Sequence, residues 1–504
     1  MREEAPFGHP PTVWHNVPMA KSVAKNALYS GIRTVSTMLF PLVTYPYVTR
    51  VLLADNLGKV DFSISIISYF TLIAGLGISN YATREGARVR NDRSKLDRFS
   101  SEVFTINMAS TALAYMLLVI LFVAWPHLHG YGALIAIQSA TLIGTTIGVE
   151  WLYTLSEDFG YITARTLVVQ VLSAVLLFTL VKSPSDYMLY AGITVFSAVG
   201  ANVFNFVRSR RYARIRLVWG FDARRHLVPM LVLFGNALAS SIYINIDVTL
   251  LGVMRGDYEV GLYSVAVKIY KLVKQLLNAI VMVSIPRLSL YVGERDHERY
   301  QQLLGSILHA LLVTVLPAIV FLFLLSDYVV LIVGGEAFAA SADSLRILCL
   351  ALAPAVFAAF VVNSILLPNR GERLILTSTI VGAVVNFLLN LIVIPQYGAN
   401  GAAITTGVAE VMVLGTAAWL GRPYCDYRAL LAEQLPACIT VALGLAAITG
   451  AHLAVTHLLG NSLLTFFVSG GVGMALYVLV LVLRKDSFAN RAISRLHNVL
   501  PHRS

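Results

Sequence analysis

Three lysines lie in an apolar stretch of the sequence, at positions 268, 271 and 274. A charge at membrane depth costs at least about 2.5–3.5 kcal/mol on insertion scales, so it normally faces water or a partner. On a helical wheel, the polar side chains that fall within roughly 80° of one another are Ser264, Lys268, Lys271, Gln275 and Asn278. Lys274 lies about 40° beyond this stripe. Such a stripe of cations and amides is suited to binding an anionic, hydrogen-bonding group.

Two other apolar segments carry polar residues at a similar helical spacing. Just before the lysines, positions i, i+4, i+7 and i+11 are occupied by Asn236, Ser240, Tyr243 and Asp247. Near the start of the chain, the same positions are occupied by Asn26, Ser30, Arg33 and Thr37. Polar faces on several apolar helices predict a hydrated, cation-rich cavity between them. The alternative is that the lysines extend along the helix to the membrane surface.

The sequence contains none of the motifs that would predict an enzyme. It has no Walker-type phosphate loop, HExxH, GxSxG or CxxC pattern. His127 and His129 are close in sequence, but two ligands alone are weak evidence for a metal site. The three cysteines show no paired spacing. We therefore predict a protein without enzymatic activity, cofactor or metal site.

The composition is that of a polytopic membrane protein. Of the 504 residues, 57% are hydrophobic and only 13% are charged, and the mean hydropathy is +0.73. Apolar runs of ~20 residues predict an all-α protein with about fourteen transmembrane helices. They are placed at 27–50, 58–81, 103–125, 131–153, 161–181, 187–207, 227–253, 261–285, 303–325, 345–367, 374–394, 399–420, 434–456 and 462–483.

The predicted spans divide into two lobes of six helices and a terminal pair. The expected units are an N-terminal tail (1–26), an N-lobe (27–210), a C-lobe (226–422), two further helices (434–483) and a C-terminal tail (484–504). The two predicted lobes show a weak internal repeat, in which Leu57-Gly58 and Val260-Gly261 occupy corresponding positions. A repeat of this kind fits two lobes that rock around a central site.

The distribution of basic residues predicts the orientation in the membrane. With both termini inside, the inside segments hold about 28 of the Lys and Arg residues and the outside loops hold about four. Most of the formal net charge of +11 is thereby explained by the cytoplasmic loops, and no nucleic-acid partner is expected. We expect a multi-pass protein of the cytoplasmic membrane with both termini in the cytoplasm.

Several long stretches, in order, resemble one family of transporters. They are residues 25–52, 56–90, 147–153 (IGVEWLY), 181–190, 242–273 and 284–289. On these stretches the chain resembles the Wzx-type oligosaccharide flippases, in the polysaccharide branch of the multidrug/oligosaccharidyl-lipid/polysaccharide (MOP) superfamily. The resemblance implies two six-helix bundles around a V-shaped lumen. It also implies transport of undecaprenyl-pyrophosphate-linked oligosaccharide repeat units to the outer leaflet, for surface polysaccharide assembly.

The resemblance also implies roles for the polar residues of the apolar stretches. Cationic side chains that could bind the diphosphate are Arg33, Lys268, Lys271 and Lys274. Amides that could bind sugar hydroxyls are Asn236, Gln275 and Asn278. Carboxylates that could couple transport to an ion are Asp247, Glu150 and Glu410, of which Asp247 could also offset a lysine in one conformation. Glu410 has no evident partner in the sequence.

Other functions remain open from the sequence. A lipid II flippase for peptidoglycan would have a similar fold and a similar charge in its lumen. A cation-coupled multidrug antiporter usually has twelve helices and an acidic lumen, whereas this lumen is expected to be cationic. A membrane scaffold without transport activity would not need charges at helical spacing. Expected partners are membrane lipids and the lipid-linked oligosaccharide, and a polysaccharide polymerase is a further candidate.

Overall fold

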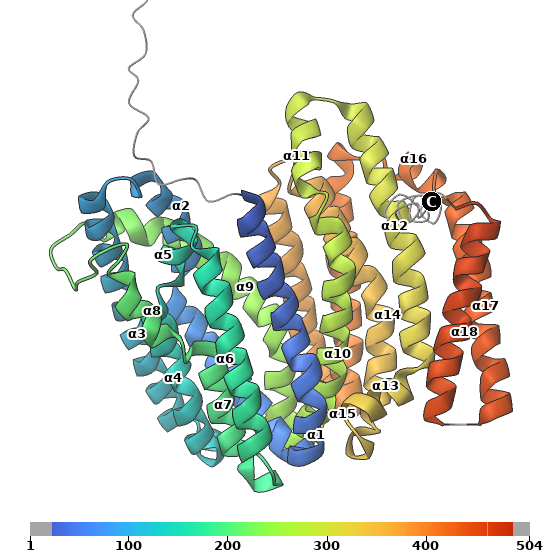
Figure 1. Ribbon diagram of the computed structural model, residues 1–504, viewed down its shortest axis with the longest axis horizontal. Coiled ribbons are helices and arrows are strands. Elements are labelled where there is room, and N and C mark those ends of the chain that lie inside the picture. Colours follow the sequence, from blue (N-terminus) through green and yellow to red (C-terminus); the bar gives the residue numbers. More distant parts are fainter. Residues whose placement is uncertain (1–22, 461, 487–504) are drawn as a thin grey trace, which may run out of the picture.

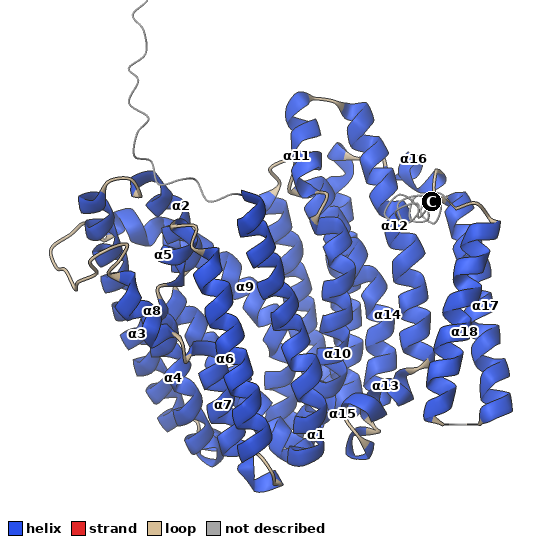
Figure 2. Ribbon diagram, in the orientation of Figure 1, coloured by secondary structure: helices blue, strands red, loops and turns tan. Residues whose placement is uncertain are grey.

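The computed structural model describes residues 23–460 and 462–486, and every regular element in these ranges is a helix (Figure 2). The all-helical structure follows from the apolar composition. Backbone N–H and C=O groups that face lipid have no water to bond with, and a helix pairs them within one segment. The predicted all-α fold is therefore confirmed. The predicted tails, 1–26 and 484–504, lie mostly outside the described residues.

Within the described residues, twelve helical stretches are long and apolar enough to cross a membrane, and two of them contain two spans each. Helix α1 (Val23–Gly75) has 53 residues, and a straight helix of that size would be about 80 Å long. Its backbone leaves the helical region at Leu53 (φ 62°, ψ 177°), and the chain reverses there (Figure 1). Helix α15 (Glu372–Gly421) is broken in the same way at Gly398 (φ 54°, ψ −130°). The prediction of about fourteen spans is thus in agreement with the structure.

The first half of the chain forms one bundle of helices around the returning arm of α1. Its further elements are α2 (Ile78–Val89), α3 (Arg93–Ala124), η1 (Pro126–Tyr131), α4 (Gly132–Gly148), α5 (Glu150–Leu155), α6 (Phe159–Leu180), η2 (Pro184–Asp186), α7 (Tyr187–Val199) and α8 (Asn202–Ser209). Asn107 and Ser110 on α3 both donate hydrogen bonds to the Ala74 carbonyl oxygen of α1, at 2.7 and 2.6 Å. Buried polar contacts of this kind fix how the helices pack where apolar packing alone would be unspecific.

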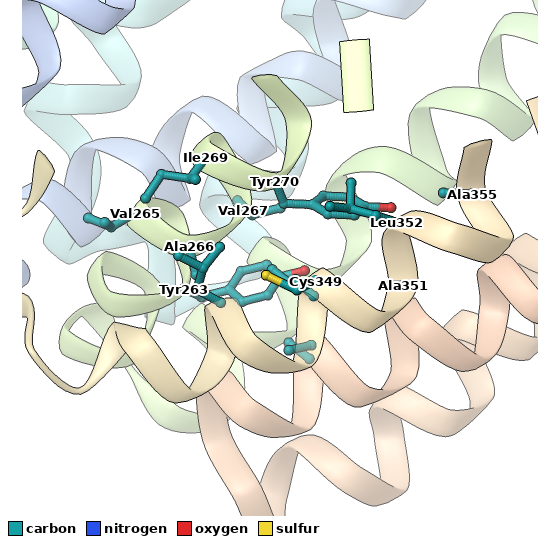
Figure 3. Close-up of a cluster of buried hydrophobic side chains, with 14 of the residues drawn as sticks. Tyr263, Val265, Ala266, Val267, Ile269, Tyr270, Cys349, Ala351, Leu352 and Ala355 are labelled. Carbon is teal, nitrogen blue, oxygen red and sulfur yellow. The ribbon is translucent and has the colours of Figure 1, made fainter. Parts of the chain in front are cut away.

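The second half forms a second bundle and a terminal pair. Its elements are α9 (Arg224–Arg255), α10 (Asp257–Met282), α11 (Ile285–Glu294), α12 (His297–Leu324), α13 (Ser326–Val333), η3 (Glu336–Phe338), α14 (Ser341–Phe360), η4 (Val361–Leu366), α15, η5 (Arg422–Tyr424), α16 (Tyr427–Ala432), α17 (Leu435–Leu459) and α18 (Leu463–Leu483). The core of this bundle lies where Tyr263 and Tyr270 of α10 pack against Cys349 and Leu352 of α14 (Figure 3). Helices α17 and α18 stand at the edge of the molecule, with α17 packed on α12 (Figure 1).

The two bundles are in close contact at Leu57-Gly58 and Val260-Gly261, the two pairs that occupy corresponding positions in the predicted repeat. A Cβ atom on Gly58 would lie 1.8 Å from the Asp257 carbonyl oxygen, and one on Gly261 would lie 2.1 Å from the Ala54 carbonyl oxygen. Neither position can carry a side chain without moving backbone. Nearby, the Thr49 hydroxyl donates to the Val333 carbonyl oxygen at 2.7 Å. The bundles are therefore closed against each other at this end, which is opposite to α2, α11 and α16 (Figure 1).

Candidate functional site

The predicted lysine stripe lies in a cleft between the first arm of α1 and α10. The cleft encloses a cavity of about 270 Å³. Its lining residues are Thr37, Met38, Pro41, Leu42, Tyr45 and Pro46 of α1, Lys268, Ile269, Lys271, Leu272 and Gln275 of α10, and Val333. Both prolines lie inside α1, where each removes a backbone hydrogen bond and bends the helix. The cleft therefore contains three of the predicted substrate-binding residues, Lys268, Lys271 and Gln275.

Lys268 forms an ion pair across the two bundles. Its Nζ atom lies 3.1 Å from Asp61 Oδ2 on the returning arm of α1 and 4.0 Å from the centroid of the Tyr45 ring. The Asp61 side chain is 11% exposed and the Lys268 side chain 39%. Asp61 was not among the predicted site residues, although a carboxylate within an apolar run was a signal for it. The charge of Lys268 is thus balanced in this conformation.

Lys271 is exposed to the cavity, one helical turn from Lys268. Within the described part of the chain, its ammonium group has neither an ion pair nor a hydrogen bond. Gln275 continues the same face and is also exposed. Asn278 follows, half-buried, and its Oδ1 atom is buried without a hydrogen-bond partner among the described residues. This face thus has a free positive charge and uncommitted amide groups, which are groups that an anionic, hydroxyl-rich ligand could use.

Lys274 has a different environment, as its offset from the stripe suggested. Its Nζ atom lies 2.5 Å from Glu410 Oε1 of α15, and the Tyr270 hydroxyl donates to the same oxygen at 3.0 Å. The Glu410 side chain is only 5% exposed. Lys274 and Glu410 therefore join two helices inside the second bundle, and Lys274 is not among the residues that line the cavity.

Asp247 lies in a buried network of neutral donors on α9, α10 and α15. It accepts hydrogen bonds from Asn390 Nδ2 at 2.6 Å, from the Thr406 hydroxyl at 2.7 Å and from the Tyr263 hydroxyl at 3.0 Å. Asn390 is further held by the Asn386 side chain at 3.1 Å. Among the described residues Asp247 has no ion pair with a lysine in this conformation. A buried carboxylate whose hydrogen-bond donors are all neutral is a candidate to bind a proton or a small cation.

Arg33 lies in a second charged cluster, within the first bundle. Its Nη2 atom is 2.6 Å from Glu150 Oε1, and Arg165 Nη2 is 3.7 Å from Glu150 Oε2. Arg165 also donates to Asn202 Oδ1 at 3.3 Å. Glu150 begins the short helix α5, directly after Val149 in a left-handed conformation (φ 39°). Two guanidinium groups share one carboxylate, so the cluster is positively charged overall. Arg165 was assigned no role from the sequence.

Asn236 lies on α9, but its side chain is outside the described residues. Among those that are described, no group of His, Cys, Asp and Glu residues could hold a metal ion.

The comparison with known families decides the classification. The sequence pattern of the family described as "Polysaccharide biosynthesis protein" matches residues 23–292, which is more than half of the chain. The chain belongs to this family. The matched residues include Arg33, Lys268 and Lys271. Together with relatives named as O-antigen transporters, the match confirms the resemblance to Wzx-type proteins.

Curated relatives of this chain carry transporter names. It is 25% identical over 399 residues to a protein named as an O-antigen transporter in Shigella dysenteriae, covering 77% of this chain and 98% of that protein. It is 22% identical over 263 residues to a protein named as the low-salt glycan biosynthesis flippase Agl15 of Haloferax volcanii, covering 51% and 54% of the two chains.

Solved structures of MOP-superfamily transporters have the same fold as this chain. The lipid II flippase MurJ in an inward closed conformation has a TM-score of 0.73 at 14% identity, covering 91% of this chain and 99% of that chain. An inward-facing MATE multidrug resistance transporter has a TM-score of 0.58 at 14% identity, covering 81% and 99%. At these identities the likeness concerns the fold alone, and it confirms the predicted fold class.

Proposed function

We propose that this protein flips undecaprenyl-pyrophosphate-linked oligosaccharide repeat units from the inner to the outer leaflet of the cytoplasmic membrane. The product would serve the assembly of a surface polysaccharide, and transport would proceed by alternating access between the two bundles. The family, and the transporter names of relatives in Shigella dysenteriae and Haloferax volcanii, support a flippase for polysaccharide precursors. The finer assignment of the lipid and its headgroup is an inference from the charged cleft.

The observation that carries the proposal is the unpaired Lys271 ammonium group on the cavity between α1 and α10. Leaving a charge uncompensated at membrane depth is unfavourable, so such a residue normally serves a ligand or an ion pathway. The other cations nearby are balanced, Lys268 by Asp61 and Lys274 by Glu410. Lys271 is therefore the residue that we assign to the pyrophosphate. A pyrophosphate could then also displace Asp61 from Lys268.

The Arg33 cluster is a second place where the pyrophosphate could bind along the same helix. Arg33 precedes the cavity residue Thr37 by one helical turn, so its guanidinium group lies on the path along α1. Arginine binds phosphate groups in a bidentate manner, and Glu150 holds the two guanidinium groups of this cluster in place. We infer that Arg33 contacts the headgroup as it enters the cleft, before it reaches Lys271.

Of the three candidate coupling carboxylates, we favour Asp247. Glu150 and Glu410 are each paired with cationic side chains, whereas the hydrogen-bond donors to Asp247 are all neutral. Binding of a proton or cation at Asp247 would change the charge of a buried network that joins α9, α10 and α15. Such a network could favour one arrangement of the bundle over another.

The localisation and topology belong to the same proposal. The end of the molecule that carries α2, α11 and α16 (Figure 1) is rich in Arg and Lys, and we assign it to the cytoplasm by the positive-inside rule. The cavity would then receive its substrate from the inner leaflet. A polysaccharide polymerase on the outer side is the partner that would consume the flipped lipid.

The experiment that tests the proposal uses a strain in which this gene is deleted and then restored. Undecaprenyl-linked intermediates are extracted and surface polysaccharide is measured. Accumulated repeat units and loss of the surface polymer, with normal cell-wall synthesis, are the expected results. Lethality with accumulated lipid II would instead indicate the peptidoglycan precursor, and unchanged glycolipids with altered drug sensitivity would indicate a multidrug antiporter.

A further inference from the structure

A second cavity, larger than the cleft between α1 and α10, lies elsewhere in the described structure. It is a groove of about 1170 Å³ on the second bundle, bounded by α12, the end of α14, the last turns of α15 and the short helix α16. Helix α16 lies at the same end of the molecule as α2 and α11 (Figure 1). The groove shares no lining residue with the cleft.

The walls of the groove are apolar and about as deep as one leaflet. They include Leu308 and Leu312 of α12, Phe357 and Phe360 of α14, and Leu414 of α15. On α12 the lining extends from Gln301 to Leu312, which corresponds to about 16 Å at 1.5 Å per residue. Half of a ~30 Å hydrocarbon core has a similar depth. The walls would therefore accommodate acyl chains of a single leaflet.

The rim of the groove is cationic and amphipathic. Arg422 and Arg428 line it and are exposed, and neither guanidinium group has an acidic partner within the part of the chain that the structure describes. The Asp426 side chain instead caps α16 by accepting from the backbone N–H groups of Arg428 and Ala429, at 3.0 and 3.2 Å. Trp419, which also lines the groove, is 61% exposed, and tryptophan is enriched at the membrane–water interface.

One further polar group in the groove lacks a partner. The hydroxyl oxygen of Tyr427 is buried and makes no hydrogen bond with the described residues, although the residue is one of those that line the groove. Arg422 and Arg428 thus offer charged donors at the rim that have no acidic partner among the described residues, and Tyr427 adds a buried hydroxyl without one. A phosphodiester group has the charge and the acceptor oxygens that these donors require.

We propose that this groove binds an anionic glycerophospholipid of the leaflet at the basic end of the molecule. The phosphate lies between Arg422 and Arg428, and the acyl chains lie along the apolar walls toward Leu312 and Leu414. The rim has two arginines and one aspartate, so its net charge matches one phosphate monoanion. The lipid connects α12, α15 and α16, and it thereby stabilises the second bundle. This site does not depend on the proposed transport function.

The groove offers a substitution that fills it without disturbing the fold. Gly415 lies on the groove wall, and a Cβ atom built on it meets no other atom within 4 Å. Gly415→Leu would therefore occupy the space of an acyl chain, and it would also replace a poor helix former by a good one. Gly450→Leu on α17 is a matched control, because its Cβ atom also meets nothing within 4 Å and it lies outside the groove.

The test is native mass spectrometry of the purified full-length protein with phosphatidylglycerol or phosphatidylcholine added in detergent. Arg373→Gln changes an exposed arginine of α15 outside the groove and is the control for the arginine variants. The wild type and the controls Arg373→Gln and Gly450→Leu should retain phosphatidylglycerol in preference to phosphatidylcholine. The double variant Arg422→Gln/Arg428→Gln, and separately Gly415→Leu, should bind phosphatidylglycerol at least about tenfold more weakly, because two charge-assisted contacts or the chain volume are lost.

Two results would overturn the proposal. One is equal retention of phosphatidylglycerol by the wild type, the double arginine variant and Gly415→Leu, which would mean that the lipid binds elsewhere. The other is equal retention of both lipids by the wild type, which would mean that the arginines do not select an anionic headgroup. If Gly415→Leu does not yield folded protein, the double arginine variant, whose side chains are exposed, decides alone.

Discussion

At the scale of single residues, the three lysines of α10 differ in their environments although they lie on one helix. Lys268 is paired with Asp61, Lys274 is paired with Glu410, and Lys271 has no partner within the described chain. The sequence placed Lys268 and Lys271 on one face and Lys274 beside it, and the structure agrees with that arrangement. The sequence alone could not show which carboxylates pair with these lysines, because Asp61 and Glu410 are distant from them in sequence and approach them only through tertiary packing.

We predict that Lys271→Gln lowers export of surface polysaccharide on the order of tenfold or more, since a cation–phosphate contact would be lost. Lys271→Arg, which keeps the charge, should retain most of the export. Export is measured by complementation of the deletion strain at matched protein level. Lys95→Gln, a substitution of an exposed lysine on α3, is the control. Normal export by Lys271→Gln would mean that this lysine does not bind the headgroup.

We predict that Asp61→Asn destabilises the protein by about 1–2 kcal/mol, which is less than for a fully buried pair because Lys268 is 39% exposed. The reason is that Lys268 loses its counter-charge at the contact between the bundles. The double variant Asp61→Asn/Lys268→Gln should be less destabilised than the sum of the two single variants. Thermal unfolding in detergent measures the loss of stability in each single variant and in the double variant. Strictly additive effects would show that the two side chains do not interact.

At the scale of the elements, the reversal of α1 at Leu53 and the approach of α10 decide where the bundles touch. The apolar runs predicted both arms of α1 and both arms of α15. The resemblance between Leu57-Gly58 and Val260-Gly261 indicated corresponding places in two lobes, but it did not show that these pairs contact each other. That contact depends on how the two helical bundles pack against each other, which no local sequence pattern specifies.

We predict that Gly58→Ala destabilises the contact between the bundles by about 1–3 kcal/mol, as overpacking does in protein cores. The new methyl group would lie 1.8 Å from the Asp257 carbonyl oxygen, so α10 must move away. Gly192→Ala on α7 is the control, because its Cβ atom meets nothing within 4 Å. The midpoints of thermal unfolding are measured for both variants and compared with that of the wild type. An unchanged midpoint for Gly58→Ala would mean that the bundles are not in contact there.

At the scale of the whole molecule, the fold class, the number of spans and the basic end were predictable, because lipid imposes long apolar helices and charge sets their orientation. The Arg33–Glu150–Arg165 cluster was not, because Glu150 and Arg165 reach Arg33 only through tertiary packing, with α6 packed on α1 and α5 packed on α2 and α6. Asn236 was predicted as a site residue and stays a prediction.

The topology can be tested with single cysteines in a variant that lacks the three native ones. Ser185→Cys in η2 should react with a membrane-impermeant thiol reagent added to intact cells, because it lies at the end opposite to α11. Glu294→Cys, at the end of α11, should react only after the cells are opened. The reverse pattern would show that the protein is inserted with its basic end outside.

The measurement that tests the central claim most directly is translocation by the purified protein in liposomes. A labelled undecaprenyl-pyrophosphate oligosaccharide is placed in one leaflet, and its appearance in the other leaflet is followed. We predict that the wild type moves the lipid faster than empty liposomes and that Lys271→Gln, reconstituted at the same density, does so about tenfold more slowly than the wild type. Translocation no faster than in empty liposomes, or equal rates for the wild type and Lys271→Gln, would contradict a flippase that binds the pyrophosphate in this cleft.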